Sequence, residues 1–321
     1  MNKISSTLLL AFVALAAHHA AFANAYPVRP IRFIVPYPPG GGADTLARTV
    51  GQKIGDAWGQ QVVIDNRPGG ATNIAAEAAA NAAPDGYTLL ETVLAHAVNA
   101  SLFPKLGYDL QRDFAPVIFM ATIPNILVVH PSVPVKSTRE LIDYARTRPG
   151  ALNYASTGNG GPQHLGMELF KTLTGVQLTH VPYKGAAPAM NAVLAGEVSM
   201  FCGPITQGLA HVKGGKLKAI GVTGSSSSAL VPELPTLSTT IPGLVVSSTY
   251  MLYAPPATPA NIAQLIKADL RKTWEDKDVR ERLGAMGMDL IWLEGAELTR
   301  RVDADLAKWS NVVKTAGIRA D

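Results

Sequence analysis

Two glycine-rich segments of this chain have the residue types and the placement of an anion-binding site. Each follows a short apolar run and precedes a helical pattern, and they read Tyr37-Pro38-Pro39-Gly40-Gly41-Gly42-Ala43-Asp44 and Ala155-Ser156-Thr157-Gly158-Asn159-Gly160-Gly161. Glycine permits positive φ and lets the main chain approach a ligand closely, so successive N–H groups can converge on one anion. The pair predicts a carboxylate site made of main-chain and hydroxyl groups. A purely structural role in a tight turn is the alternative for each segment.

Nucleotide and metal binding are not indicated at these turns. Neither Gly-x-Gly-x-x-Gly nor Gly-x-x-x-x-Gly-Lys-Ser/Thr occurs at either of them. His164 and Glu168 share a helix face at i and i+4, but the pattern His-Glu-x-x-His is absent and no third ligand is apparent. A packed histidine is therefore favoured over a metal ligand, and we expect neither a metal nor a cofactor.

For several side chains near the turns, the sequence allows either a structural role or contact with the ligand. Asp44 either caps the first helix or contacts the ligand. Ser156 and Thr157 either donate their hydroxyls to the carboxylate, which we favour, or cap the next helix. Lys184 either brings a positive charge to the cleft or lies on a solvated loop.

An enzyme would need a nucleophile with a base, and the sequence shows no such arrangement. The Gly-x-Ser-x-Gly elbow is absent, and paired acids are missing from the loops that follow strands. Cys202 is the single cysteine, with no histidine beside it in the sequence, so it is a poor nucleophile candidate and forms no internal disulfide. We expect no catalytic residue and no enzyme; a cleft hydrolase acting through Ser156 is the remote alternative.

Short β-rich runs alternate with helical patterns, which is typical of βαβ units and a largely parallel sheet. The predicted strands are 31–36, 61–65, 87–92, 126–130, 152–155, 178–182, 198–201, 219–223 and 246–253. The predicted helices are 44–58, 138–147, 163–173, 187–195 and 205–213, with others near 74, 259 and 298. Ligands of parallel α/β sheets bind beyond the carboxyl ends of the strands. Both glycine-rich turns lie at such ends.

The length of the chain suits two α/β lobes with a ligand cleft between them. We predict that lobe I is discontinuous, formed by residues 26–125 plus 245–321, and that lobe II comprises 126–244. The reason is that 246–253 looks like a strand, while the C-terminal helices would form a third domain too small to stand alone. A chain that crosses twice between lobes forms a hinge.

The first 25 residues read as a signal peptide. Lys3 is their only charged residue, the apolar run from Leu8 to Ala17 is too short for the roughly 20 residues of a membrane span, and small residues permit cleavage after Ala23 or Ala25. We therefore expect residues 1–25 to be removed and the mature protein to lie outside the cytoplasm, with a membrane anchor as the alternative. Lys and Arg are scattered in a chain of net charge +4, which argues against nucleic acid as a partner.

An ordered set of motifs resembles the Bug (Bordetella uptake gene) family, the TctC-like solute receptors of tripartite tricarboxylate transporters. The motifs span essentially the whole mature chain and are Tyr26-Pro27 to Arg32, the first glycine-rich turn, Asn66-Arg67-Pro68-Gly69-Gly70 with Asn73-Ile74-Ala75, Ala83-Pro84-Asp85-Gly86-Tyr87-Thr88-Leu89-Leu90, Val181-Pro182-Tyr183-Lys184-Gly185 and Leu234-Pro235-Thr236. The resemblance implies a two-lobed, type II-like periplasmic binding protein fold. It also implies a periplasmic location, a membrane permease as partner, and a ligand carboxylate gripped by the two glycine-rich turns.

The resemblance also implies particular ligand-binding residues. These are Tyr37, Gly41, Gly42, Ala43, Asp44 and Thr45 in the first turn, Ser156, Thr157, Gly158, Gly160, Gly161 and His164 in the second, and Ala95 and His96 facing the cleft, with Tyr183 helping to choose the ligand. Family members bind dicarboxylates and tricarboxylates, acidic amino acids and aromatic acids. The expected function is capture of a small organic carboxylate for a transporter by a monomer; the alternative is a receptor that signals to a membrane sensor.

The sequence departs from the family pattern at two places. Thr249 and Met251 stand where an aromatic residue and a glycine are usual, and the segment from Ser199 to Cys202 lacks a common acidic residue. We expect both places to bear on ligand choice. The missing acid removes one partner for an amino group, which favours an aliphatic or aromatic acid over an amino acid.

Overall fold

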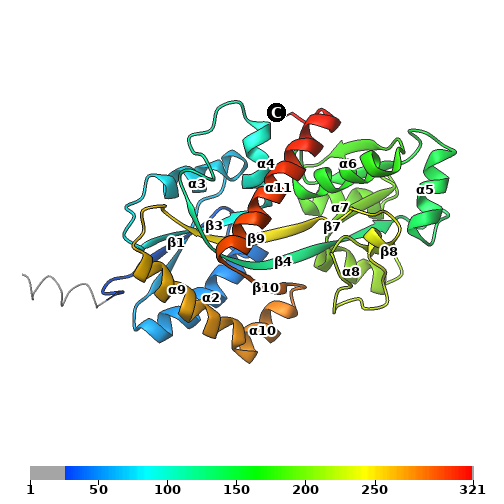
Figure 1. Cartoon of the computed structure of the whole chain (residues 1–321). Coiled ribbons are helices and arrows are strands. Elements are labelled where there is room, and N and C mark those ends of the chain that lie inside the picture. Colours follow the sequence, from blue (N-terminus) through cyan, green and yellow to red (C-terminus); the bar gives the residue numbers. More distant parts are fainter. Residues whose placement is uncertain (1–25, 320–321) are drawn as a thin grey trace, which may run out of the picture.

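The computed structural model describes residues 26–319, and the predicted signal peptide of residues 1–25 lies outside them (Figure 1). Within the described range, none of the helices combines the length and the apolar character that crossing a membrane requires.

A first group of strands is ordered β2-β1-β3-β9-β4, with β10 on the other side of β4. Parallel pairs join β1 to β2 and β3, whereas β9 is antiparallel to β3 and to β4. The strands are β1 Ile31–Val35, β2 Val62–Asn66, β3 Thr88–Val93, β4 Ala115–Val129, β9 Ser247–Ala254 and β10 Asp289–Leu293. The helices that accompany them are α2 Gly42–Trp58, α3 Asn73–Ala80, α4 Leu94–Leu102, α9 Ala260–Glu275, α10 Lys277–Gly284 and α11 Gly295–Ala316.

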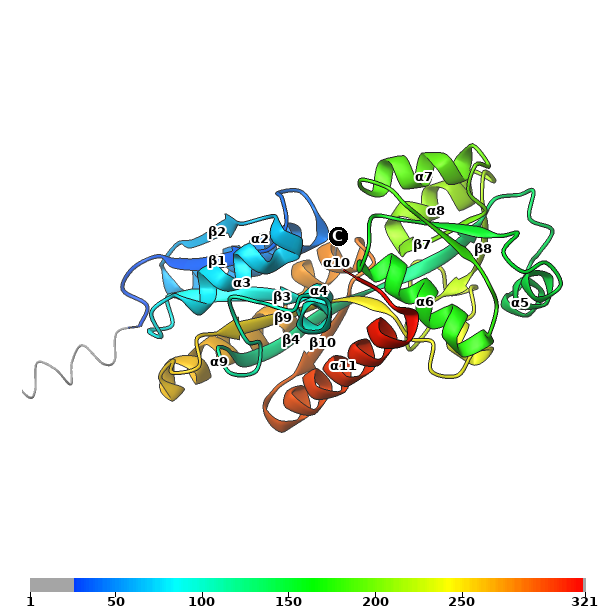
Figure 2. The ribbon, with the colours of Figure 1, turned by 90° about the horizontal axis from the view of Figure 1, so that it is seen from above.

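A second group of strands shares β4 and is ordered β4-β7-β5-β6, with β8 also paired to β4. The strands are β5 Asn153–Ser156, β6 Thr179–Pro182, β7 Met200–Pro204 and β8 Lys218–Val222, and the helices are α5 Thr138–Arg146, α6 Pro162–Thr174, α7 Ala186–Leu194 and α8 Ile205–Lys213. Seen from above, the two groups form separate masses, and β4 and β9 run between them (Figure 2). The boundaries 26–125 plus 245–321 and 126–244 stay a prediction.

Each predicted strand and helix overlaps an observed one, but β4 is much longer than the predicted 126–130. Pro116 and Pro124 interrupt its pattern, because proline cannot donate to a strand ladder and usually marks an edge or a bulge. Here the register of β4 against β9 shifts between Pro116 and Ile118, so a bulge accommodates the first proline. The sequence also gave no sign of α4, α10 or β10.

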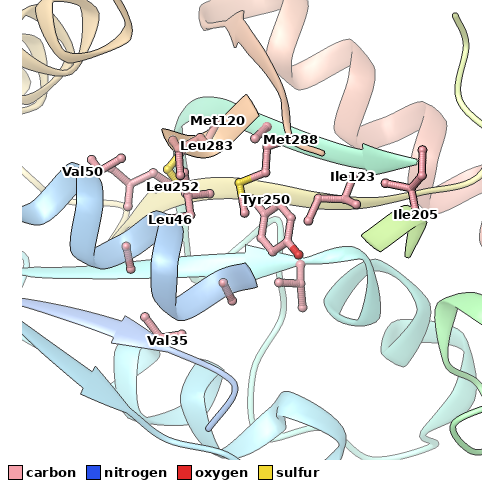
Figure 3. Packing of buried hydrophobic residues seen from close by; sticks show 14 of the residues in the cluster. Val35, Leu46, Val50, Met120, Ile123, Ile205, Tyr250, Leu252, Leu283 and Met288 are labelled. Carbon is pink, nitrogen blue, oxygen red and sulfur yellow. The ribbon is translucent and has the colours of Figure 1, made fainter. Parts of the chain in front are cut away.

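The core around the strand crossing is apolar and closely packed (Figure 3). Leu46 and Val50 of α2 pack with Leu252 of β9, and Met288 packs beside Tyr250. Because α2 is held against β9 in this way, the glycine-rich turn that precedes it has a fixed position above the end of the first strand group.

The last helix connects the two strand groups. α11 contacts α4, α6 and β4, and Trp309 is buried with Leu165 of α6 and Leu127 of β4. Figure 2 shows α11 running from the first group toward α6. The C-terminal segment therefore packs against elements on both sides of the strand crossing.

Candidate functional site

Two adjoining chambers form a cleft at the carboxyl ends of the strands. Their volumes are about 520 Å³ and about 480 Å³, and Tyr37, Pro38, Thr157 and Pro162 line both. We call the larger the helix-end chamber and the smaller the turn chamber. Each has residues from both glycine-rich turns in its wall, so the cleft lies where the sequence places it.

The helix-end chamber is surrounded by the starts of helices. First-turn residues in its wall are Gly42 and Ala43 of α2, Leu94 of α4, Pro162 and Gln163 of α6, Ala186 of α7 and Gln207 of α8. The first N–H groups of a helix have no acceptor within the helix, and its N-terminus carries partial positive charge. Such ends attract anions. Their convergence gives the chamber a positive potential that needs no ionised side chain.

Among the described residues, no Lys, Arg, His, Asp or Glu lines either chamber. The polar groups of the helix-end chamber are instead neutral and include Gln163, Gln207, Ser248 and the phenol of Tyr250. An anion in this cleft therefore meets hydrogen-bond donors and helix ends rather than a salt bridge.

The start of α2 lies unusually close to β9. A Cβ on Gly42 would be 3.0 Å from the Tyr250 hydroxyl and 3.3 Å from Cδ1 of Ile123. Burial, and then the nearby Glu91, raise the pKa of Tyr250, so its phenol keeps its proton and remains a donor. Glycine at 42 thus lets the N–H groups of α2 and a phenol share one wall (Figure 3).

Asp44 and Thr45, predicted to bind the ligand, do not line the cleft. Asp44 is buried, and its carboxylate accepts hydrogen bonds from Gly40 N at 2.9 Å, Arg48 Nε at 2.9 Å and Asn66 Nδ2 at 3.0 Å. Burial raises its pKa, but these donors outweigh burial and lower it. The N-cap is Gly41, so Asp44 is not the capping residue itself; it reaches back and fixes the turn.

In the second glycine-rich turn, too, only some of the residues predicted to bind the ligand line the cleft. Thr157, Gly160 and Gly161 line the cleft, and Thr157 Oγ1 donates to Gln163 Oε1 at 2.9 Å. Ser156 is fully buried, with Oγ 2.6 Å from His180 Nε2, and neither it nor Gly158 lines a chamber. The prediction that Ser156 faces the ligand, and the hydrolase alternative built on it, do not fit this burial.

His164 supports the second turn from behind. Its Nδ1 accepts from Gly160 N at 3.1 Å, and its ring stacks on that of His180 with centroids 3.9 Å apart. Glu168, one turn further along α6, accepts from Tyr154 Oη at 2.6 Å and pairs with Lys171. Within residues 26–319, no group of three or more His, Cys, Asp or Glu is placed to hold a metal ion.

Ala95 lines the turn chamber, but its neighbour His96 faces away from it. His96 is fully buried, and its Nδ1 accepts from Val93 N at 3.1 Å. Burial lowers its pKa to about 4, which keeps the ring neutral. Tyr183 also lies outside the chamber walls; its main-chain N–H bonds Ser156 O.

Of the two departures from the family pattern, only the first reaches the cleft. Thr249 lines the helix-end chamber. Ser199 precedes β7 at the end opposite the cleft, where its hydroxyl donates to Asn153 Oδ1 at 2.8 Å, so the expectation that it selects the ligand is wrong. Cys202 is buried, and burial raises its pKa to about 12, which leaves no reactive thiolate.

Several cleft residues have no signal in the sequence. Gln207, Ser248 and Tyr250 reach the helix-end chamber, and Thr72 and Asn99 reach the turn chamber. Ser248 and Tyr250 reach the cleft because β9 returns beside β3, and Asn99 reaches it because α4 begins there. Gln207 lies in α8, and Thr72 directly precedes α3. The pairing of β9 and the start of α4 do not follow from local residue patterns. The turn Arg67-Pro68-Gly69-Gly70 follows a predicted strand and precedes a predicted helix, but its residues give no separate indication of ligand contact.

Comparison with known proteins agrees with the fold and the cleft. The model of the tripartite tricarboxylate transporter family receptor matches residues 46–318. The chain is 34% identical to protein BugT of Bordetella pertussis over 301 residues, covering 92% of each chain. Among solved structures, Rpa4515 of R. palustris with adipate has a TM-score of 0.78 at 34% identity, covering 92% of this chain and 99% of that one.

A second solved structure gives the same result. MatC of Rhodopseudomonas palustris, with bound malate, has a TM-score of 0.74 at 32% identity and covers 90% of this chain and 100% of its own. These similarities confirm the predicted binding-protein fold. The chain belongs to the tripartite tricarboxylate transporter family receptors, which are solute-binding proteins and not enzymes.

Proposed function

We propose that this protein captures a small organic carboxylate in the periplasm and delivers it to the membrane permease of a tripartite tricarboxylate transporter. The observation that carries the proposal is the helix-end chamber, where helix starts converge on a space that no charged side chain of residues 26–319 lines. This arrangement stabilises a carboxylate through N–H groups and helix dipoles. The adipate and malate of the two Rhodopseudomonas structures support the same ligand class.

The family membership supports the proposed location and partner. A cleavable signal peptide at residues 1–25 would export the chain, and a soluble monomer could close its two lobes on the ligand and present the closed form to the permease. Loss of carboxylate uptake on deletion of the gene, restored by the full chain, is the expected result. Undiminished uptake would contradict the transport role.

The binding claim is tested with a carboxylate panel and one pair of glycine variants. Gly160 has φ +71° and lines the turn chamber, and a Cβ there would lie 2.6 Å from Cδ1 of Leu102, which lines the same chamber. Gly150 has φ +73° with no atom near its Cβ position, so Gly150→Ala carries the same backbone strain away from the cleft. We expect Gly160→Ala to weaken carboxylate binding, measured by calorimetry, by about tenfold or more.

The matched variant gives the test its control. Gly150→Ala should bind like the wild type after a similar loss of stability. If none of the carboxylates stabilised the wild-type protein, the proposed function would be contradicted. Equal binding by both variants would show instead that the second turn does not contact the ligand.

A further inference from the structure

Glu91 of β3 carries a carboxyl group in the interior of the first strand group. The residue is fully buried, and within residues 26–319 neither of its carboxyl oxygens has a hydrogen-bond partner. An ionised carboxylate is far more costly to bury without a partner than a neutral acid. Burial, and then the charge of Asp44, hold the pKa of Glu91 well above its usual value. The structure therefore accommodates this group in its protonated form.

The strand register places the Glu91 carboxyl close behind the helix-end chamber. Val93 lies two residues further along β3 and pairs with Tyr250 of β9, and both of these residues line the chamber. Side chains two residues apart on a strand point to the same face and are about 7 Å apart. Leu89 and Val93, on either side of Glu91, belong to the same apolar core as the buried face of α2. The Glu91 side chain thus points toward α2, one residue pair below the chamber wall.

Titratable side chains from the neighbouring elements face Glu91. Asp44 of α2 pairs with Arg48, and the donors around its carboxylate lower its pKa, so it remains ionised. Burial, and then Glu91 itself, raise the pKa of Tyr37 in the turn after β1 to about 12, and they also raise the pKa of Tyr250. Asp44 and the two phenols therefore keep a fixed charge near neutral pH. Glu91 is the member of this cluster whose charge can change.

A carboxylate ligand in the helix-end chamber brings a negative charge near Glu91. The ligand and an ionised Glu91 would both lie near the start of α2, whose N-terminus carries only about half a unit of positive charge. Two unit charges about 8 to 12 Å apart, at an effective dielectric constant of about 20, repel each other enough to change a binding constant by about 10- to 30-fold. Binding of the anion therefore favours the protonated form of Glu91.

We propose that Glu91 is the proton switch of the carboxylate site: the helix-end chamber holds its anion while Glu91 is protonated, and loss of that proton to solvent weakens binding. The inference rests on the proposed function, in which a carboxylate lies in this chamber. Because the coupling is reciprocal, binding of the anion also draws a proton from solvent to Glu91 at a pH where the empty protein has lost it. Carboxylate affinity then falls as the surroundings become alkaline.

Calorimetry on the full mature protein from pH 6.5 to pH 9 tests the switch. Adipate and malate are the probes, because their carboxyl groups titrate below this range. Each titration is repeated in phosphate and in Tris, whose ionisation heats differ, so that the two binding enthalpies give the number of protons taken up. Glu91→Gln keeps the shape without the titration, and Glu91→Leu removes the polar group. Glu197→Gln, at an exposed position, is the matched control.

The wild type and Glu197→Gln should lose about 10- to 30-fold in affinity as the pH rises through the titration of Glu91. In that interval they should take up as much as one proton for each ligand bound. Glu91→Gln and Glu91→Leu should keep the affinity of the protonated wild type at every pH and take up no proton. A purely structural role of Glu91 would instead change the affinity by the same factor at every pH.

Two results would overturn the switch while the proposed function stands. One is a wild-type affinity for adipate and malate that does not change from pH 6.5 to pH 9. The other is a fall in affinity that both Glu91 variants share with the wild type. If neither variant folds, the wild type alone decides, since binding without proton uptake at every pH overturns the switch and proton uptake supports it. Failure of every carboxylate to bind the wild type would instead contradict the proposed function, and the switch with it.

Discussion

A buried carboxyl group lies behind the helix-end chamber and gives the sharpest test of the structure. Glu91 of β3 is fully buried, and within residues 26–319 neither of its carboxyl oxygens has a hydrogen-bond partner. Burial, and then the negative charge of Asp44, raise its pKa well above the usual value of 4.5. Burial and Glu91 together also raise the pKa of Tyr37 to about 12, and burial followed by Glu91 raises that of Tyr250.

The direction of the pH effect follows from proton linkage. The folded state keeps the Glu91 proton at a pH where the unfolded chain has released it, so folding takes up a proton. The stability that this group contributes is present below pH 4.5 and is lost as pH rises toward the folded pKa. The loss is about 1.4 kcal/mol per pH unit within that window.

The replacement Glu91→Gln removes the titration and keeps the shape. Relative to this variant, the wild type should lose unfolding free energy as the pH rises above 5 toward the folded pKa of Glu91, at up to about 1.4 kcal/mol per pH unit. Urea denaturation of both proteins at several pH values measures the difference in unfolding free energy. The contributions of all other titrating groups are the same in both proteins and cancel in this difference. Glu197→Gln, at an exposed position, is the control and should follow the wild type.

Parallel pH profiles for wild type and Glu91→Gln would refute the reasoning. They would mean that the carboxyl has the same proton affinity folded and unfolded, which is incompatible with a fully buried group that lacks polar partners. A profile that rises with pH would show an ionised Glu91 paired with a cation in the folded state.

Two further outcomes test the packing. Trp309→Ala should lower the unfolding free energy by about 3 to 5 kcal/mol in urea, because the side chain is 2% exposed against α6 and β4, whereas the exposed Lys314→Ala should change it little. Cys202 should resist a thiol reagent at pH 8 in the folded protein and react with one equivalent in urea, since burial raises its pKa to about 12; rapid labelling of the folded chain would contradict its burial.

The fold could be predicted largely because its signals are local. Each predicted strand has apolar residues of the right length before a turn, and 246–253 was recognised in this way although it pairs far along the chain. The first half of β4 is not predicted from the sequence, because prolines such as Pro116 and Pro124 usually end a strand. The structure accommodates them by a bulge and by the crossing between strand groups, and both depend on tertiary pairing.

The predicted site residues divide into those that line the chambers and those that lie outside the chamber walls. Tyr37, Gly41, Gly42, Ala43, Ala95, Thr157, Gly160 and Gly161 line the chambers, whereas Asp44, Thr45, His96, Ser156, Gly158, His164 and Tyr183 do not. A sequence pattern gives the turn but not the direction of each side chain. That direction depends on the hydrogen bonds the turn itself requires.

Asp44, His96 and His164 show this requirement most clearly. Each is the third residue of its helix, in α2, α4 and α6, and each accepts a hydrogen bond from a main-chain N–H at or just before the N-cap. This is the reach-back half of a capping box. By satisfying those N–H groups from behind, the three side chains fix the turns and leave the first N–H groups of the helices directed at the chamber. Polar residues that the sequence marks as ligands thus serve the site by binding the backbone that forms it.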